Sequence, residues 1–123
     1  KYMLDKDFKT LDQFHGACIL KSGNSLIGFT GINEYKPKQP EFELQFGVAY
    51  WGHGYATEIG RAVIKECFAA TDTELIYGIV NPQNQASKRV MEKLGMHCIG
   101  LQEFRGSFDL FYQISRGPAP THN

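Results

Sequence analysis

The sequence predicts a mixed α/β fold whose central sheet is antiparallel at one end and parallel near the middle. In the first half, two short apolar runs separated by turn residues indicate an antiparallel hairpin. In the second half, strands alternate with two amphipathic helices, and crossovers of this kind bring parallel strands into one sheet. With 123 residues the chain has room for one domain. We expect this domain at 1–116, followed by a flexible tail at 117–123.

The elements of the first half are assigned by hydrophobic spacing. Leu4, Phe8 and Leu11 are spaced by four and three residues, which predicts the buried face of a short helix. A polar stretch with two prolines predicts a surface loop at 34–40. Gly47 lies inside an apolar run and predicts either a bulge or the close approach of another group there. Apolar runs bounded by turn residues predict strands at 14–20, 26–32 and 42–49.

The second half contains two helices and three strands. An apolar stripe from Tyr55 to Ala70 predicts the first helix. Asn-Pro-Gln-Asn at 81–84 opens the second, with Pro82 in its first turn and Gly95 as a left-handed C-terminal cap. The first strand is expected to be buried on both faces. Apolar runs predict these strands at 75–80, 97–104 and 108–115.

Composition limits the classes of partner. Lys and Arg total 13 and Asp and Glu total 13, so no net charge attracts nucleic acid or an anionic membrane. No apolar run approaches the ~20 residues that span a bilayer. The three cysteines, Cys18, Cys67 and Cys98, form no CxxC pair, and the histidines lack metal-ligand spacing. We therefore expect a cytoplasmic protein without a metal, a membrane segment or a nucleic-acid partner.

Gly52 and Gly54 lie between a predicted strand and a predicted helix. Glycines there let the backbone approach a ligand closely, and the unpaired N–H groups of a helix start bind phosphate. The spacing matches neither the GxxxxGK[ST] phosphate loop nor the GxGxxG dinucleotide motif. A plain glycine-rich turn is the alternative interpretation.

Two longer motifs surround these glycines. The chain contains Glu-Leu-x-Phe-Gly-Val, then Tyr-Trp-Gly-x-Gly-Tyr-Ala-Thr-Glu, and later Asn-Pro-x-Asn-x-Ala-Ser-Lys-Arg-Val-Met-Glu-Lys-Leu-Gly-Met. Together they closely resemble the GNAT superfamily of acetyl-CoA-dependent N-acetyltransferases, and within it the ribosomal-protein N-terminal acetyltransferase branch. The resemblance covers about 14–116. In the family signature Gln/Arg-x-x-Gly-x-Gly/Ala, Trp51 takes the first place, Gly54 the fourth and Ala56 the sixth.

The resemblance implies acetyl-CoA as the cosubstrate and a splayed parallel pair of strands in the middle of a helix-flanked sheet. The coenzyme A pyrophosphate would lie on the backbone amides of 53–57, because Trp51 leaves phosphate binding to the backbone. The pantetheine arm would pair with the strand edge at 46–48 and contact Asn84. The expected cofactor-binding residues are Phe46, Gly47, Val48, Trp51, Gly52, His53, Gly54, Tyr55, Ala56, Thr57 and Asn84.

Acetyl transfer to an amine requires the amine to lose a proton, and the departing thiolate can take one. Glu43 lies where many family members carry a catalytic glutamate, so it is the expected base, direct or through water. Its alternative is a solvent-facing strand residue, and Glu41 is the second candidate base. Ser87 is the expected acid or thiolate hydrogen-bond donor, with a helix capping contact as its alternative. The amides of 46–48 are further expected to polarise the thioester carbonyl.

Two functions are therefore considered. The favoured one is an acetyltransferase acting on a primary amine, either a protein N-terminus or a small molecule such as a polyamine or antibiotic. The other is a non-catalytic acyl-CoA-binding relative with a structural or regulatory role. The chain does not begin with Met, and the family's acceptor wall would precede Lys1, so we interpret the domain as N-terminally incomplete. The acceptor and the oligomeric state, a homodimer included, are left open.

Overall fold

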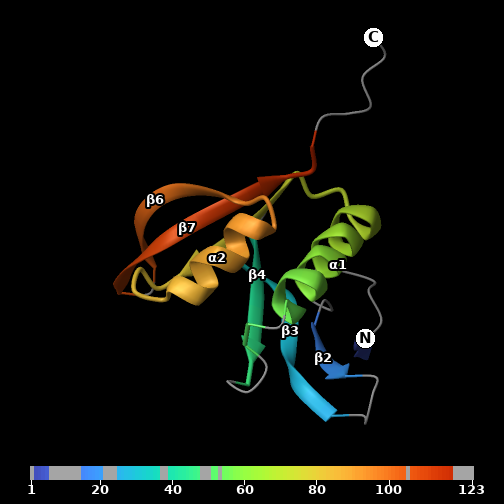
Figure 1. Ribbon diagram of the computed structural model, residues 1–123. Helices are drawn as coiled ribbons and strands as arrows, with labels where there is room; N and C mark the ends of the chain where they lie inside the picture. Colours follow the sequence, from blue (N-terminus) through green and yellow to red (C-terminus); the bar gives the residue numbers. More distant parts are fainter. Residues whose placement is uncertain are drawn as a thin grey trace.

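In the described residues, seven strands form one mixed sheet and two helices lie against it (Figure 1). The computed structural model describes residues 2–5, 15–20, 25–36, 39–47, 51–52, 54–104 and 106–117. The order across the sheet is β1-β2-β3-β4-β5-β7-β6. The helices are α1 (Tyr55–Ala70) and α2 (Gln85–Lys93). The strands are β1 (Tyr2–Asp5), β2 (His15–Leu20), β3 (Ser25–Lys36), β4 (Gln39–Phe46), β5 (Leu75–Val80), β6 (His97–Phe104) and β7 (Ser107–Ser115).

Neighbouring strands are antiparallel except for β4 and β5, which run parallel in the middle of the sheet. The predicted mixed α/β sheet is therefore confirmed. The parallel pair is short, since only Glu41 with Tyr77 and Phe42 with Gly78 stand in register. Both strands continue beyond these residues without further pairing, so their carboxyl ends separate. This is the splayed pair that the resemblance implies.

Both helices cover the same face of the sheet. Phe42 and Gly78 are partners in register and point to one side. A methyl group added at Gly60 of α1 would lie 3.1 Å from the Phe42 ring, and one at Gly78 would lie 2.7 Å from the Met91 sulfur of α2. These two glycines therefore let both helices pack closely on that side. The core between helices and sheet consists of Cys18, Ile27, Ile32, Phe42, Ile59, Val63, Ile64, Cys67, Ile76, Val80, Met91, Leu94, Met96 and Tyr112.

The other face of the sheet carries no helix among the described residues. Burial alternates along β5 as a result: Ile76, Gly78 and Val80 are buried beneath the helices, whereas the alternate residues are half-buried. The expectation that this strand is buried on both faces is therefore wrong for the described structure.

Two sequence predictions in the first half are also wrong. Leu4 belongs to β1 and pairs with Cys18 of β2, so the start of the expected helix is a strand. Phe8 and Leu11 lie outside the described residues. The expected loop at 34–40 is largely strand, because β3 and β4 continue pairing as far as Lys36 and Gln39. In both places, pairing with a neighbouring strand determines the structure, and a short spacing pattern does not reveal it.

The start of α2 differs from the prediction by one turn. Asn84 is its N-cap, and Pro82 lies in the preceding turn instead of the first turn of the helix. The Asn84 side chain decides this boundary, because it accepts a hydrogen bond from the backbone N–H of Ser87 at 3.0 Å. At the other end, Gly95 has φ of 86°, which confirms the predicted left-handed cap.

Arg116, just after β7, holds the carboxyl end of α1. Its guanidinium donates hydrogen bonds to the carbonyl oxygens of Phe68, of Thr71 at 2.8 Å and of Thr73 at 2.6 Å. It also lies 5.3 Å from the centre of the Phe68 ring. Because the last turn of α1 has no basic residue of its own, this distant arginine supplies the cation that favours a helix carboxyl end.

Candidate functional site

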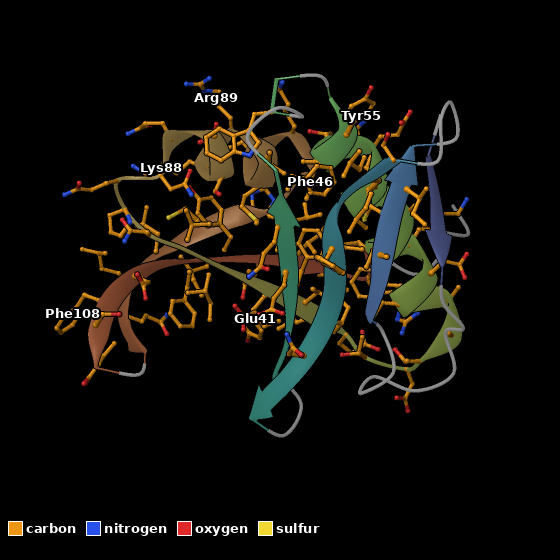
Figure 2. All side chains as sticks on the ribbon, turned by 90° about the horizontal axis from the view of Figure 1, so that it is seen from below. Glu41, Phe46, Tyr55, Lys88, Arg89 and Phe108 are labelled. Carbon is orange, nitrogen blue, oxygen red and sulfur yellow. The ribbon has the colours of Figure 1, made fainter. Side chains whose placement is uncertain are left out.

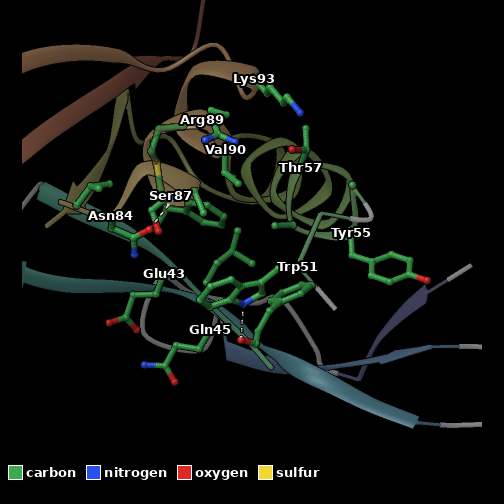
Figure 3. Close-up of a pocket in the computed structure, with 18 of the residues that line it drawn as sticks. Glu43, Gln45, Trp51, Tyr55, Thr57, Asn84, Ser87, Arg89, Val90 and Lys93 are labelled. Atoms are coloured by element: carbon green, nitrogen blue, oxygen red, sulfur yellow. Dashed lines mark hydrogen bonds between the residues drawn. The ribbon is translucent and has the colours of Figure 1, made fainter. Parts of the chain in front are cut away.

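A cavity of about 560 Å³ lies where β4 and β5 separate, between the first turns of α1 and α2 (Figure 3). This volume suits a small organic ligand. The cavity continues from the helix-covered side of β4 to the opposite side, because residues of both faces of that strand line it. The expected site residues that line it are Glu43, Phe46, Trp51, Gly52, Gly54, Tyr55, Ala56, Thr57, Asn84 and Ser87.

The start of α1 has no capping side chain. Gly54 is the N-cap, with φ of 79° and ψ of 0°, a left-handed conformation that glycine adopts without strain. Its carbonyl accepts the first helical hydrogen bond, from the Glu58 N–H at 3.1 Å. The first turn of α1, whose residues Ala56 and Thr57 line the cavity, therefore receives no capping hydrogen bond from the N-cap side chain. The backbone N–H groups of such a helix start are suited to an anion.

The start of α2 is occupied by its own cap. The Asn84 side chain accepts from the Ser87 N–H, and the Asn84 carbonyl accepts from the Lys88 N–H at 3.1 Å. The capping contact of Ser87 is therefore made by its backbone, and its side chain lines the cavity. The helix-capping role uses the Ser87 backbone N–H, whereas the expected role as hydrogen-bond donor to the thiolate would use the hydroxyl. The two roles are therefore compatible.

Two carboxylates line the cavity from β4. Glu41 is 8% exposed and Glu43 is half-buried, both on the face opposite the helices. The apolar residues that alternate with them face the helices, as the alternative interpretation of Glu43 supposed, yet Glu43 still lines the cavity because β4 and β5 have separated there. Asn33 of β3 donates a hydrogen bond from Nδ2 to Oε2 of Glu43. Sequence reasoning did not single out Asn33, whose position follows only from the register of β3 with β4.

Trp51 covers the end of β4. Its indole N–H donates to the carbonyl oxygen of Phe46 at 3.0 Å, and the side chain is 55% exposed (Figure 3). Gly47 is not among the residues that line the cavity, and its N–H donates to the carbonyl oxygen of Ile27 in β3 at 3.1 Å. The bulge expected at Gly47 is absent from the described part of β4, whose register with β3 is regular at this end.

Val48 and His53, two further expected cofactor-binding residues, lie outside the described residues.

Two cations of α2 line the cavity and were not predicted as site residues. Arg89 and Lys93 are one helical turn apart and exposed. Figure 3 shows them across the cavity from Glu43 and Gln45. The Arg61 side chain of α1 donates to the Lys93 carbonyl at 3.1 Å, which ties the two helices together at this end. Arg89 and Lys93 are four residues apart in the helix that begins after Asn84, and this spacing was the available sequence signal.

The remaining titratable groups of interest lie away from the cavity. Burial raises the pKa of Cys18 to about 11. Burial also raises the pKa of Tyr112, and the negative charges of Cys98 and Glu92 add to this effect. Tyr112 belongs to the core, and Tyr55 lines the cavity with its ring directed away from Glu43 (Figure 3).

Two classes of feature are absent from the described part of the chain. No three of its His, Cys, Asp or Glu residues are grouped as ligands for a metal ion. Neither of its helices combines the length and apolar character needed to cross a membrane.

A model of the acetyltransferase (GNAT) domain matches residues 2–97. The chain belongs to the GNAT family. The family resemblance in the sequence motifs is thereby confirmed. Ribosomal-protein acetyltransferases are also among the solved proteins that share this fold.

Individual solved structures share this fold, and one curated protein shares part of the sequence. A GNAT-family acetyltransferase from Bacillus anthracis has 28% sequence identity and a TM-score of 0.74, covering 85% of this chain and 68% of that chain. Mycobacterium smegmatis RimJ, solved in complex with CoA-disulfide, has 20% identity and a TM-score of 0.69, covering 84% and 54%. The uncharacterized protein YkkB of Bacillus subtilis (strain 168) is 39% identical over 57 residues. That match covers 46% of this chain and 33% of YkkB.

Proposed function

We propose that this chain carries the catalytic site of an N-acetyltransferase, which moves an acetyl group from acetyl-CoA to a primary amine. The observation that carries the proposal is the cavity between the separated strands β4 and β5, with the uncapped start of α1 at its edge. A thioester with a phosphorylated carrier fits this combination, because the helix start suits phosphate and the gap suits a narrow arm. Membership of the GNAT family supports the same cosubstrate.

The cofactor would bind at three places along the cavity. The pyrophosphate would accept hydrogen bonds from the first-turn amides of Tyr55, Ala56 and Thr57. The pantetheine arm would lie in the gap beside Phe46, and Asn84 would border it from α2. Trp51 now donates to the Phe46 carbonyl, so an arm that pairs with this strand edge must share that oxygen with the indole or displace it.

In the proposed reaction the acetyl group moves directly from the thioester sulfur to the amine nitrogen, and the proton lost by the amine passes to a carboxylate. The amine nitrogen attacks the thioester carbonyl carbon, a C–N bond forms, and the C–S bond breaks. Glu43 takes the proton released by the amine, directly or through water, and Glu41 is the neighbouring carboxylate that could take this role instead. Asn33 orients the Glu43 carboxylate through its hydrogen bond.

Leaving-group stabilisation would come from the start of α2. The Ser87 hydroxyl would donate a hydrogen bond or a proton to the departing sulfur, since its backbone N–H already serves the cap. A thiolate is a tolerable leaving group near neutral pH, so this contribution is the smaller of the two proton events. Backbone amides near the end of β4 would polarise the thioester carbonyl.

The acceptor amine would approach from the face of the sheet that carries Glu41 and Glu43. Both carboxylates lie on that face, opposite α1 and α2. Two negative groups attract an ammonium, and their partial burial strengthens the attraction relative to water. A protein N-terminus or a small-molecule amine fits this chemistry equally.

The test uses Trp51, the single tryptophan of the chain, as a reporter inside the cavity. Acetyl-CoA should change its fluorescence saturably, and a library of primary amines should then cause thioester loss with release of coenzyme A. The Trp51→Phe variant controls for inner-filter effects. A thiol reagent measures the released coenzyme A, but it also reacts with the exposed Cys98. The signal from the protein alone is therefore subtracted, and Cys18 and Cys67 contribute little to it because they are buried.

Three results are distinguishable. Binding with amine-dependent thioester loss supports the transferase. Saturable binding with no turnover across the library, in the full-length protein, favours the non-catalytic acyl-CoA-binding alternative. Absence of binding contradicts both functions.

A further inference from the structure

Arg89 and Lys93 form a cationic pair at the helix side of the cavity. They occupy the same side of α2, one turn apart, and both side chains are exposed at the cavity edge. Within the described residues neither of them forms an ion pair. The hydrogen bond from Arg61 to the Lys93 carbonyl fixes this end of α2 beside the first half of α1.

The charges around the cavity are separated by sign. Figure 2 shows Arg89 on α2 well separated from Glu41 on β4, and Figure 3 shows Lys93 and Thr57 on the helix side of the cavity. The positive end of the α1 dipole and the two side-chain cations therefore lie on one side, and the β4 carboxylates on the other. This side therefore carries two side-chain cations in addition to the α1 amides.

Coenzyme A carries a second anionic group, the phosphate monoester on the 3′-oxygen of its ribose. Such a monoester bears close to two negative charges at neutral pH. An arginine guanidinium binds two phosphate oxygens at once, and a lysine ammonium provides a mobile point charge. Since the α1 amides would engage the pyrophosphate, these two side chains remain for the monoester.

We propose that Arg89 and Lys93 bind the 3′-phosphate and make the protein select coenzyme A over dephospho-coenzyme A. The inference rests on the proposed cofactor site and adds to it a separate subsite that determines specificity. The pyrophosphate contacts act equally on both ligands. The Arg89 and Lys93 contacts act on coenzyme A alone.

The experiment measures the affinities of coenzyme A and dephospho-coenzyme A side by side, by Trp51 fluorescence and by calorimetry. The parent protein should bind coenzyme A about 10-fold more tightly, because charge-assisted hydrogen bonds to phosphate are lost with the monoester. Arg89→Ala and Lys93→Ala should each reduce this ratio, and the double variant should bring it close to one. The ratio in the parent should also fall as salt is raised.

Lys88→Ala is the matched control. It removes the same charge from the same helix, at a residue that does not line the cavity, so the ratio should stay at the parent value. Arg89→Lys should retain part of the selectivity.

Equal binding of both ligands by the parent would overturn this inference and leave the proposed cofactor site standing. An equal loss of both ligands in Arg89→Ala would also overturn it, by assigning the side chain to the pyrophosphate. Binding of neither ligand would contradict the proposed function itself.

Discussion

The two helix starts at the cavity are built in opposite ways. At α1 the N-cap is Gly54, which has a left-handed backbone and no side chain to accept from the first turn. At α2 the N-cap is Asn84, whose side chain accepts from the Ser87 N–H. Both starts border the same space. One therefore keeps its backbone donors for a ligand, and the other uses its own side chain to fix the helix.

Because of this difference, the start of α1 should affect ligand binding and the start of α2 should affect the stability of the fold. A helix start with glycine at the N-cap forgoes a few tenths of a kcal/mol relative to Asn or Ser, and a bound anion adds stabilisation there. A capped start keeps that stabilisation whether the cavity is filled or empty. Variants at the two starts should therefore change different measurements. Variants of the β4 carboxylates should change the chemical step and leave coenzyme A binding and stability unchanged.

The largest effect on turnover is expected from a substitution in β4, which lines the cavity together with the two helix starts. Glu43→Gln keeps the size and hydrogen bonding of the side chain but removes its ability to accept a proton, so turnover should fall ~10²-fold or more. Affinity for acetyl-CoA, measured by Trp51 fluorescence, should be unchanged. Glu41→Gln is the matched control and should cost less turnover. Parental turnover in Glu43→Gln between pH 6 and 9 would move the base to Glu41 or to water.

At the uncapped start, Gly54→Val should weaken coenzyme A binding ~30-fold, or ~2 kcal/mol. Valine rarely adopts the positive φ of this position, so the first-turn amides should be displaced from their ligand. Dephospho-coenzyme A should lose equally, because both ligands carry the pyrophosphate. Calorimetry on a variant shown by circular dichroism to be folded provides the measurement. Unchanged affinity for coenzyme A would show that Gly54 only forms a turn and has no role in binding the pyrophosphate.

At the capped start, Asn84→Ala should lower the free energy of unfolding by about 1 kcal/mol. Asn84→Ser, which can still cap, should lose much less. Urea unfolding of both variants provides the comparison with the parent. A parental stability combined with a large loss of coenzyme A affinity would show that the Asn84 side chain turns toward the cofactor when it binds.

The smallest effect is expected for Ser87→Ala. The backbone N–H of residue 87 still donates to Asn84, so unfolding should be unchanged and turnover should fall only a few-fold, less than in Glu43→Gln. Steady-state kinetics with acetyl-CoA and an accepted amine measure this. A loss confined to acetyl-CoA binding would make Ser87 a cofactor contact with no role in the departure of the thiolate.

Long periodic segments of the sequence predicted the fold well. The apolar stripe of α1 and the compact apolar run of β5 have the predicted bounds, Tyr55–Ala70 and Leu75–Val80. Predictions failed where a distant partner decides the structure. Leu4 pairs with Cys18 in a sheet, and the Gly47 N–H is used by Ile27 of β3 instead of forming a bulge.

The residues of the candidate site also fall into two groups, those that local sequence patterns revealed and those that only distant contacts place at the cavity. Glycines and capping residues were visible as local patterns, and Gly54, Asn84 and Ser87 do line one cavity. Asn33 and Arg89 were not recognised, because each reaches the site through the register of a sheet or the packing of a helix. Such placement depends on contacts between segments that lie far apart in the sequence.

The position of β7 in the sheet has a consequence for the order in which the protein assembles during synthesis. β5 pairs with β7 along its whole length, from Leu75↔Ser115 to Val80↔Leu110, but with β4 only at two residues. One wall of the cavity is therefore held mainly by a strand that is synthesised about 30 residues after it. Arg116, which follows that strand, also fixes the end of α1.

A nascent chain that ends before β7 therefore exposes an unpaired edge of β5, a surface that favours aggregation. Coenzyme A cannot protect this intermediate, because the cavity that would bind it is not yet closed. The cofactor site should thus form only once β7 has been synthesised, although the residues that line it all precede β7 in the sequence.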